Sequence, residues 1–97
     1  MNVTVVYGRF EWDRSKEHLN VREHGIDFKE AVKAFADTER IIATDDAHSQ
    51  TEPRFFCIGL IEHKVLTVRF TPRGNRIRII GAGFWRKGRQ LYEQENT

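Results

Sequence analysis

The stretch that decides the fold runs from Lys64 to Ile80 and reads KVLTVRFTPRGNRIRII. Apolar and polar residues alternate on both sides of Pro72-Arg73-Gly74-Asn75, a sequence typical of a tight turn. The stretch therefore predicts a hairpin of two antiparallel strands. Burial of its apolar set places Arg69, Arg76 and Arg78 together on the opposite face, because a register shift of one residue would bury these charges.

The elements around this hairpin follow from capping signals and periodicity. Asp13 suits the N-cap of a helix over residues 14–24, and Gly25 suits its C-terminal end. Asp27 and Glu30 have the spacing of a capping box at the start of a second helix. The predicted strands lie at residues 3–10, 40–44, 54–61, 64–71 and 76–80, and a last helix lies at residues 84–95. We expect an α+β fold of order β-α-α-β-β-β-β-α, with an antiparallel sheet and the helices packed on one side.

Length and composition predict a single folded domain over residues 1–97. Aromatic residues make up 11% of the chain and hydrophobic residues 39%, which is more than a disordered chain contains. Cys57 is the one cysteine, so we expect neither an intrachain disulfide nor a cysteine metal motif. No stretch resembles a signal peptide or a membrane span, and we therefore expect a cytoplasmic protein without membrane contact.

Charge is distributed unevenly along the chain. Residues 1–63 contain 8 Lys or Arg and 12 acidic residues, whereas residues 64–97 contain 8 Lys or Arg and 2 acidic residues. Such segregation favours a polyanion partner, and we expect RNA. A solvated basic face and a surface for an acidic protein are the alternatives. The residues expected to contact RNA are Arg73, Arg76, Arg86, Lys87, Arg89 and Tyr92.

Candidate catalytic residues are three arginines and one histidine. Arg69 and Arg78 suit the stabilisation of phosphate charge, because a guanidinium can bind two phosphate oxygens at once. His48 is a candidate acid or base, oriented by Glu52, although it can equally be a loop histidine in solvent. Arg54 can contact phosphate or simply pair with Glu52. The carboxylates around His48 match no metal-binding motif, so neither a metal nor another cofactor is expected.

Several segments, in order, resemble the BrnT family of bacterial toxins, part of the RelE-like group of small ribonucleases. The resemblance begins at Phe10-Glu11-Trp12-Asp13, continues through His24-Gly25-Ile26-Asp27-Phe28 and closes on Arg73-Gly74-Asn75-Arg76-Ile77-Arg78-Ile79-Ile80. It covers roughly residues 10–93. It implies a cytoplasmic toxin that cleaves RNA without metal and halts translation. It also implies a BrnA-type antitoxin with a DNA-binding ribbon-helix-helix domain. The toxin–antitoxin complex then contacts operator DNA only through the antitoxin.

Three glycines depart from the pattern that the resemblance implies. Family members usually continue after the last strand with Ser-Ala-Arg and carry a Glu in the last helix, where this chain has Gly81-Ala82-Gly83 and Gly88. If the missing arginine helps to bind the scissile phosphate, activity is weakened or lost. The alternative function is therefore a catalytically inactive relative that binds antitoxin and nucleic acid. An unrelated basic interaction protein is a third hypothesis.

Overall fold

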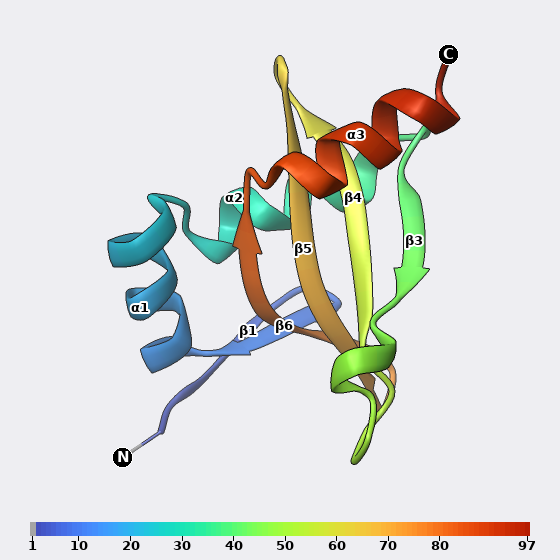
Figure 1. The fold of residues 1–97 in the computed structure, drawn as a ribbon. Coiled ribbons are helices and arrows are strands. Elements are labelled where there is room, and N and C mark those ends of the chain that lie inside the picture. Colours follow the sequence, from blue (N-terminus) through green and yellow to red (C-terminus); the bar gives the residue numbers. More distant parts are fainter. Residues whose placement is uncertain (1) are drawn as a thin grey trace.

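A six-stranded sheet with helices on both faces makes up residues 2–97, the part of the chain that the computed structural model describes (Figure 1). The elements are β1 (Thr4–Tyr7), β2 (Phe10–Asp13), α1 (Arg14–His24), α2 (Phe28–Val32), η1 (Lys33–Ala36), β3 (Ile41–Thr44), η2 (Asp46–His48), β4 (Phe55–Ile61), β5 (Lys64–Arg73), β6 (Arg76–Gly83) and α3 (Arg86–Glu95). The strand order is β1-β2-β6-β5-β4-β3, and only β2 and β6 pair in parallel. The predicted α+β class and the central hairpin are confirmed.

The predicted single strand over residues 3–10 is wrong, because the chain forms a hairpin of β1 and β2 there. Gly8 lies in this turn at φ 61°, a left-handed conformation that glycine adopts without steric cost. β2 then lies between β1 and β6, with Trp12 opposite Ile79. Since β2 pairs with a strand near the other end of the chain, local sequence patterns could not predict its place.

The prediction that all helices pack on one side of the sheet is also wrong. On one side, Phe28 of α2 and Leu66 of β5 belong to the main core and have no exposed surface. On the other side, Tyr92 of α3 packs with Ile58 and Val65. Figure 1 shows α3 in front of β5 and β4, with η1 behind these strands and α2 behind β6. β4 and β5 carry apolar residues on both faces, and each face therefore needs a helical cover.

The helix caps predicted from the sequence are confirmed. The Asp13 carboxylate accepts the backbone N–H of Ser15 at 2.8 Å, which caps α1. Gly25 ends α1 in a left-handed conformation, with φ 71°. Asp27 accepts the N–H of Glu30 at 2.8 Å and caps α2. These caps satisfy backbone groups that a helix end leaves unpaired, and they fix where each helix begins and ends.

α1 is held along the part of β6 that β2 does not reach. The side-chain amide of Asn20 accepts the backbone N–H of Ala82 at 3.0 Å and donates to the carbonyl of Ile26 at 3.0 Å. Asn20 is buried, and it therefore joins α1, the start of α2 and β6 through one side chain. This contact brings α1 beside Arg69, which lies in the next strand.

Tyr92 anchors α3 to the segment before β3. Its hydroxyl donates to Asp37 at 2.6 Å, and this bond, with burial, raises the pKa of Tyr92 to about 12. Burial alone would raise the pKa of Asp37, but hydrogen bonds from Tyr92, Leu60 N–H and Glu39 N–H hold that pKa below its ordinary value. The hydroxyl is thus kept neutral and the carboxylate ionised.

Replacing Tyr92 with phenylalanine is expected to destabilise the fold by about 2 kcal/mol at pH 7, because a hydrogen bond to a charged group is lost. The raised pKa adds stability that is present below the unfolded tyrosine pKa of about 10 and disappears as the pH rises through about 12. Urea unfolding of both proteins at pH 7 and above pH 10 tests this. An unchanged difference between them at alkaline pH would contradict the assignment.

Candidate active site and nucleic-acid interface

Five arginines gather on the side of the sheet that α3 also covers in part. The register pairs Thr71 with Arg78 and Arg73 with Arg76, and paired residues of neighbouring strands point to the same side. Thr71 and Arg69 are two residues apart on β5 and share this side as well. The predicted common face of the hairpin arginines is thus present. We call this set the arginine face: Arg54, Arg69, Arg73, Arg76 and Arg78.

Arg78 is held by an acid that the sequence did not single out. Its Nη1 lies 2.5 Å from Oε2 of Glu11, its parallel neighbour on β2. Both side chains are largely buried, with 18% of Arg78 and 11% of Glu11 exposed. The pair fixes the guanidinium in place and balances its charge. The alternation of Phe10, Glu11 and Trp12 already predicts that Glu11 points away from the aromatic core, but its partner depends on the unpredicted place of β2.

Arg54 and Arg73 share one carboxylate. Oε2 of Glu52 lies 3.0 Å from Arg54 and Oε1 lies 3.2 Å from Arg73. The hydrogen bond from Arg54 and the second from Arg73 outweigh burial and hold the pKa of Glu52 below its ordinary value. The predicted Glu52–Arg54 ion pair is confirmed. Glu52 ties the loop before β4 to the β5–β6 hairpin.

Arg69 differs from its neighbours because it has no acid partner. Within residues 2–97 it forms no ion pair, and its Nε is buried without a hydrogen-bond acceptor. The guanidinium lies against Gly81, and a Cβ at that position would be 3.0 Å from its Nη2. The same cavity, of about 130 Å³, is also lined by Lys16, Glu23, His24 and Trp85, and Glu23 forms no ion pair with Arg69. A partly buried cation without an ion-pair partner is costly, so this position favours an anion such as phosphate.

His48 is oriented by Asp45, and the prediction that Glu52 orients it is wrong. Nδ1 of His48 lies 2.9 Å from Oδ2 of Asp45, while Glu52 is occupied by two arginines. Asp45 is buried at 6% exposure, whereas 56% of the His48 side chain is exposed. A carboxylate at Nδ1 favours a proton on that nitrogen and leaves Nε2 as an acceptor. This arrangement suits a general base.

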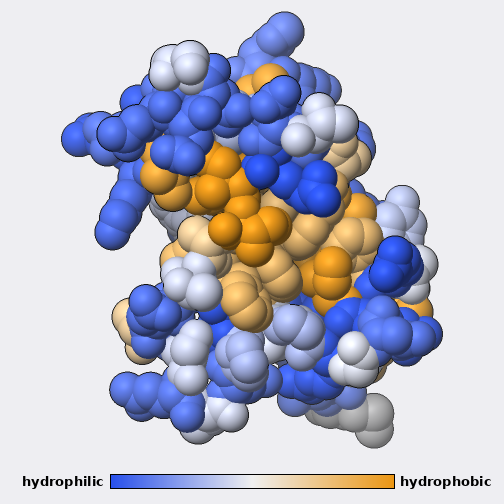
Figure 2. All heavy atoms as spheres, turned by 90° about the vertical axis from the view of Figure 1, so that its right-hand side faces the viewer, coloured by the Kyte–Doolittle hydropathy of each residue, from blue (hydrophilic) through white to orange (hydrophobic). Residues whose placement is uncertain are grey.

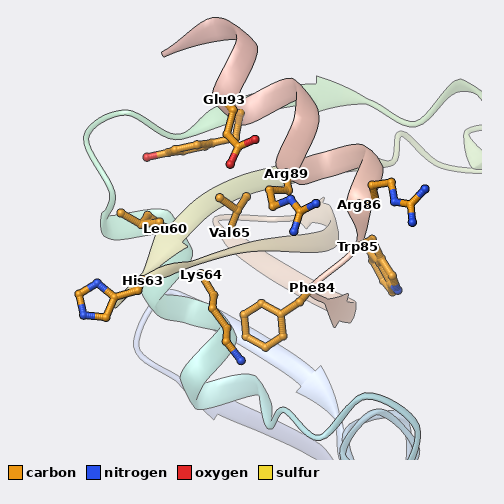
Figure 3. Close-up of a pocket in the computed structure, with 10 residues that line it drawn as sticks. Leu60, His63, Lys64, Val65, Phe84, Trp85, Arg86, Arg89 and Glu93 are labelled. Atoms are coloured by element: carbon orange, nitrogen blue, oxygen red, sulfur yellow. The ribbon is translucent and has the colours of Figure 1, made fainter. Parts of the chain in front are cut away.

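A basic groove runs along α3. Figure 3 shows Arg86 and Arg89 on the helix, with Lys64 and Phe84 side by side below it. Nζ of Lys64 lies 5.5 Å from the centre of the Phe84 ring. These residues line a cavity of about 550 Å³, and Arg86, Arg89 and the nearby Lys87 are exposed. The three α3 cations predicted to bind RNA are therefore accessible to phosphate.

Tyr92 lies in the floor of the basic groove, but its environment does not suit the predicted stacking on a base. It is 9% exposed, and its hydroxyl is bonded to Asp37. Three other aromatic residues on this side of the sheet have accessible surface: Trp85 and Phe56 are half-buried, and Phe84 in the basic groove is exposed. These rings are better placed than Tyr92 to stack on a base.

Residues 2–97 bring no three His, Cys, Asp or Glu side chains together in a way that can hold a metal ion. Cys57 is buried in the core, and burial raises the pKa of its thiol to about 12. Among these residues no helix combines the length and the hydropathy that a membrane crossing requires.

A family model described as "Ribonuclease toxin, BrnT, of type II toxin-antitoxin system" matches residues 12–88. The chain belongs to the BrnT family. No curated protein matches it. As a BrnT ribonuclease toxin of a type II toxin–antitoxin system, it has RNA as its substrate class and an antitoxin as its partner. The match includes His48 and the whole arginine face, and it ends before Arg89 and Tyr92. The resemblance seen in the sequence is confirmed.

The glycines that depart from the expected BrnT pattern lie where neighbouring side chains fill the space. A Cβ on Gly83 would lie 2.5 Å from the Trp85 indole, and a Cβ on Gly88 would lie 1.9 Å from Oγ1 of Thr67. Trp85 also meets the ring of His24 edge-on, at 5.4 Å between centroids. In this BrnT chain, the indole covers the position at which an arginine was expected, and α3 packs directly on β5. A side chain at position 83 or 88 would have to displace Trp85 or Thr67.

Proposed function

We propose that this chain cleaves RNA without a metal ion, by attack of a ribose 2′-oxygen on the adjacent phosphorus. The observation that carries the proposal is Arg69, a partly buried cation with no acid partner, on the face of an arginine-rich sheet. Its position favours an anion, and in a ribonuclease toxin the relevant anion is the scissile phosphate. A guanidinium can also stabilise the extra charge of the phosphorane transition state.

Arg78 supplies a second positive charge in this proposal. The Glu11 carboxylate holds its Nη1, which leaves the remaining N–H groups of the fork to contact phosphate oxygens. Glu11 is thus a positioning residue, and Arg78 is held by its surroundings before RNA binds. Arg54 contributes less to phosphate binding, because it already forms an ion pair with Glu52. The exposed cations expected to follow the RNA backbone are Arg73, Arg76, Arg86, Lys87 and Arg89.

His48 acts as the acid–base group in the proposed reaction. Its Nε2 removes the proton of the 2′-hydroxyl while the 2′-oxygen forms a bond to phosphorus. The bond from phosphorus to the 5′-oxygen then breaks, and that oxygen takes up a proton from the protonated imidazole. The products are a 2′,3′-cyclic phosphate and a 5′-hydroxyl end, so no water, metal or redox partner is consumed. Asp45 supports the step because it holds the imidazole by Nδ1.

A BrnA-type antitoxin with a ribbon-helix-helix domain completes the proposal. The basic surface of residues 64–97 suits an acidic segment of such a partner, which would cover the arginine face and block RNA. Operator DNA is contacted by the antitoxin and not by this chain. The free toxin acts in the cytoplasm and stops translation by destroying RNA there.

Purified protein is expected to cleave single-stranded RNA in excess EDTA and to leave 2′,3′-cyclic phosphate ends. His48→Ala should lower the rate by about 10²–10⁴-fold, and Asp45→Asn should lower it less, because the imidazole loses only its orientation. His18→Ala is the matched control, since His18 is exposed on α1 and lines none of the three cavities. Cleavage that stops in EDTA, or that His48→Ala leaves unchanged, would contradict this mechanism. Growth arrest on induction connects the activity to toxicity.

A catalytically inactive antitoxin-binding relative is the second candidate function. The close contacts at Gly83 and Gly88 favour it, because they occupy the positions at which an arginine and a glutamate were expected. In that case well-folded protein binds its antitoxin and leaves RNA intact under all ionic conditions. Intact RNA together with normal growth on induction would select this function over cleavage.

A further inference from the structure

A second groove lies beside α3, on the side away from the basic groove and toward the β3 edge. Its volume is about 320 Å³, and we call it the α3 slot; it is lined mainly by Ala43, Phe56, Ile58, Trp85, Gly88 and Leu91. Figure 2 looks at the β3 edge and shows a band of apolar side chains between hydrophilic regions above and below. The slot is therefore a mostly apolar recess that opens at an edge of the sheet.

Two aromatic side chains give the α3 slot flat apolar walls. Phe56 pairs across the strands with Arg69, which places the slot directly beside the proposed phosphate site. The Trp85 indole lies against Gly83, and Trp85 lines both the slot and the cavity that contains Arg69. Aromatic rings next to a cation are the usual means by which proteins hold unpaired bases and their phosphates.

The open end of the slot also offers hydrogen-bonding groups. β3 is an edge strand, and the N–H of Asp45 donates to the carbonyl of Arg54 at 2.8 Å. In an antiparallel pair, residues alternate between those bonded to the partner strand and those whose backbone points away. Thr44, next to Asp45, therefore directs its N–H and C=O away from β4, and it lines the slot. One donor and one acceptor at this place can contact the edge of a base.

We propose that the α3 slot binds the nucleobase of the nucleotide whose phosphate contacts Arg69. The inference rests on the proposed function, because it places the substrate of the same site. Phe56 and Trp85 stack on the base, Thr44 contacts its edge, and Lys87 at the rim attracts the next phosphate. The slot then contributes to the choice of the nucleotide at which RNA is cut. An apolar side chain of a protein partner is the competing occupant.

The test compares nucleoside 5′-monophosphates with ribose 5-phosphate, which has the same sugar and phosphate but no base. Methyl NMR signals of Ala43, Ile58 and Leu91 are expected to shift with the nucleotides and not with ribose 5-phosphate. Phe56→Leu keeps an apolar side chain but removes the ring, and it should weaken nucleotide binding roughly 10-fold. Tyr7→Leu is the matched control, because it removes an exposed aromatic ring from β1 at the opposite edge of the sheet.

The outcomes separate this inference from the proposed function. Equal methyl shifts with ribose 5-phosphate, or undiminished nucleotide binding by Phe56→Leu, would overturn the base site even if the protein cleaves RNA. Methyl shifts with an antitoxin peptide and none with any nucleotide would assign the slot to the protein partner and also overturn it. Base-dependent shifts in a protein that cleaves no RNA would support the slot and refute the proposed cleavage.

Discussion

Replacing Arg69 with alanine is expected to reduce RNA cleavage by on the order of 100-fold or more, equivalent to about 3 kcal/mol of transition-state stabilisation. The same change should leave the free energy of unfolding nearly unchanged. Arg69 has no ion pair within residues 2–97, and its Nε is buried without an acceptor, so its removal takes no ion pair from the fold and relieves an unsatisfied donor. Cleavage assays and urea unfolding of the same preparations measure the two effects.

Two further variants separate the charge of Arg69 from its shape. Arg69→Lys keeps the charge and loses the planar fork, and it should recover only part of the activity. Arg22→Ala removes an exposed arginine in the last turn of α1 and should change neither activity nor stability. If Arg69→Ala unfolds more easily in proportion to its loss of activity, Arg69 is structural and the proposed phosphate site is wrong.

Gly88→Ala is expected to destabilise the protein by about 2 kcal/mol, although alanine in a helix is normally more favourable than glycine by about 1 kcal/mol. Alanine is expected to lower the free energy of unfolding here because a Cβ at this position would lie 1.9 Å from Oγ1 of Thr67. α3 would then have to move away from β5. Urea unfolding measures the change. A stabilised Gly88→Ala protein would show that α3 does not pack against β5 in this way.

A double-mutant cycle assigns the effect to this one contact. Thr67→Ala removes the hydroxyl, which has no hydrogen-bond partner, and it should cost little on its own. Combined with Gly88→Ala it should recover at least about 1 kcal/mol of the loss. Gln90→Ala, on the exposed side of the same helix, should shift stability by less than about 0.5 kcal/mol. Additive effects of the two changes would contradict direct contact.

These contacts affect any attempt to restore the expected family residues. An arginine at position 83 would meet the Trp85 indole, and a glutamate at position 88 would meet Thr67. Single restorations are therefore expected to destabilise the fold before they add any activity. An arginine at position 83 also requires a smaller residue in place of Trp85, because the indole and the arginine side chain would occupy the same space.

The sequence predicted the parts of this fold that depend on neighbours in the chain. Caps at Asp13 and Asp27, the turn at Gly74 and the common face of Arg69 and Arg78 all follow from spacings of a few residues. The second hydrophobic cluster, in which Tyr92 packs with Ile58 and Val65, did not follow from such spacings. α3 packs on the far side of the sheet because Gly88 permits close approach to Thr67, and nothing within the helix sequence indicates which face it will meet.

Only the part of the candidate site that lies on the β5–β6 hairpin was predicted from the sequence. The hairpin arginines were identified correctly as a group, but their partners were not. Glu11 reaches Arg78 through the parallel pairing of β2 with β6, and Asp45 reaches His48 through a short 3₁₀ turn. The place of Glu11 depends on tertiary structure, and no local pattern predicts it. Asp45 is only three residues from His48, and the short 3₁₀ turn that joins them was not predicted in a stretch expected to be a loop. Glu52, four residues from His48, pairs instead with Arg54 and Arg73.

The pairing of β2 with β6 has a consequence during synthesis of the protein. Glu11 and Arg78 are 67 positions apart, so a nascent chain cannot form their contact until most of it has left the ribosome. Until then neither the sheet order nor the arginine face exists in the growing polypeptide. If the arginine face is the site of cleavage, as proposed, the toxin acquires that site only near the end of its own translation, when its message has already been read.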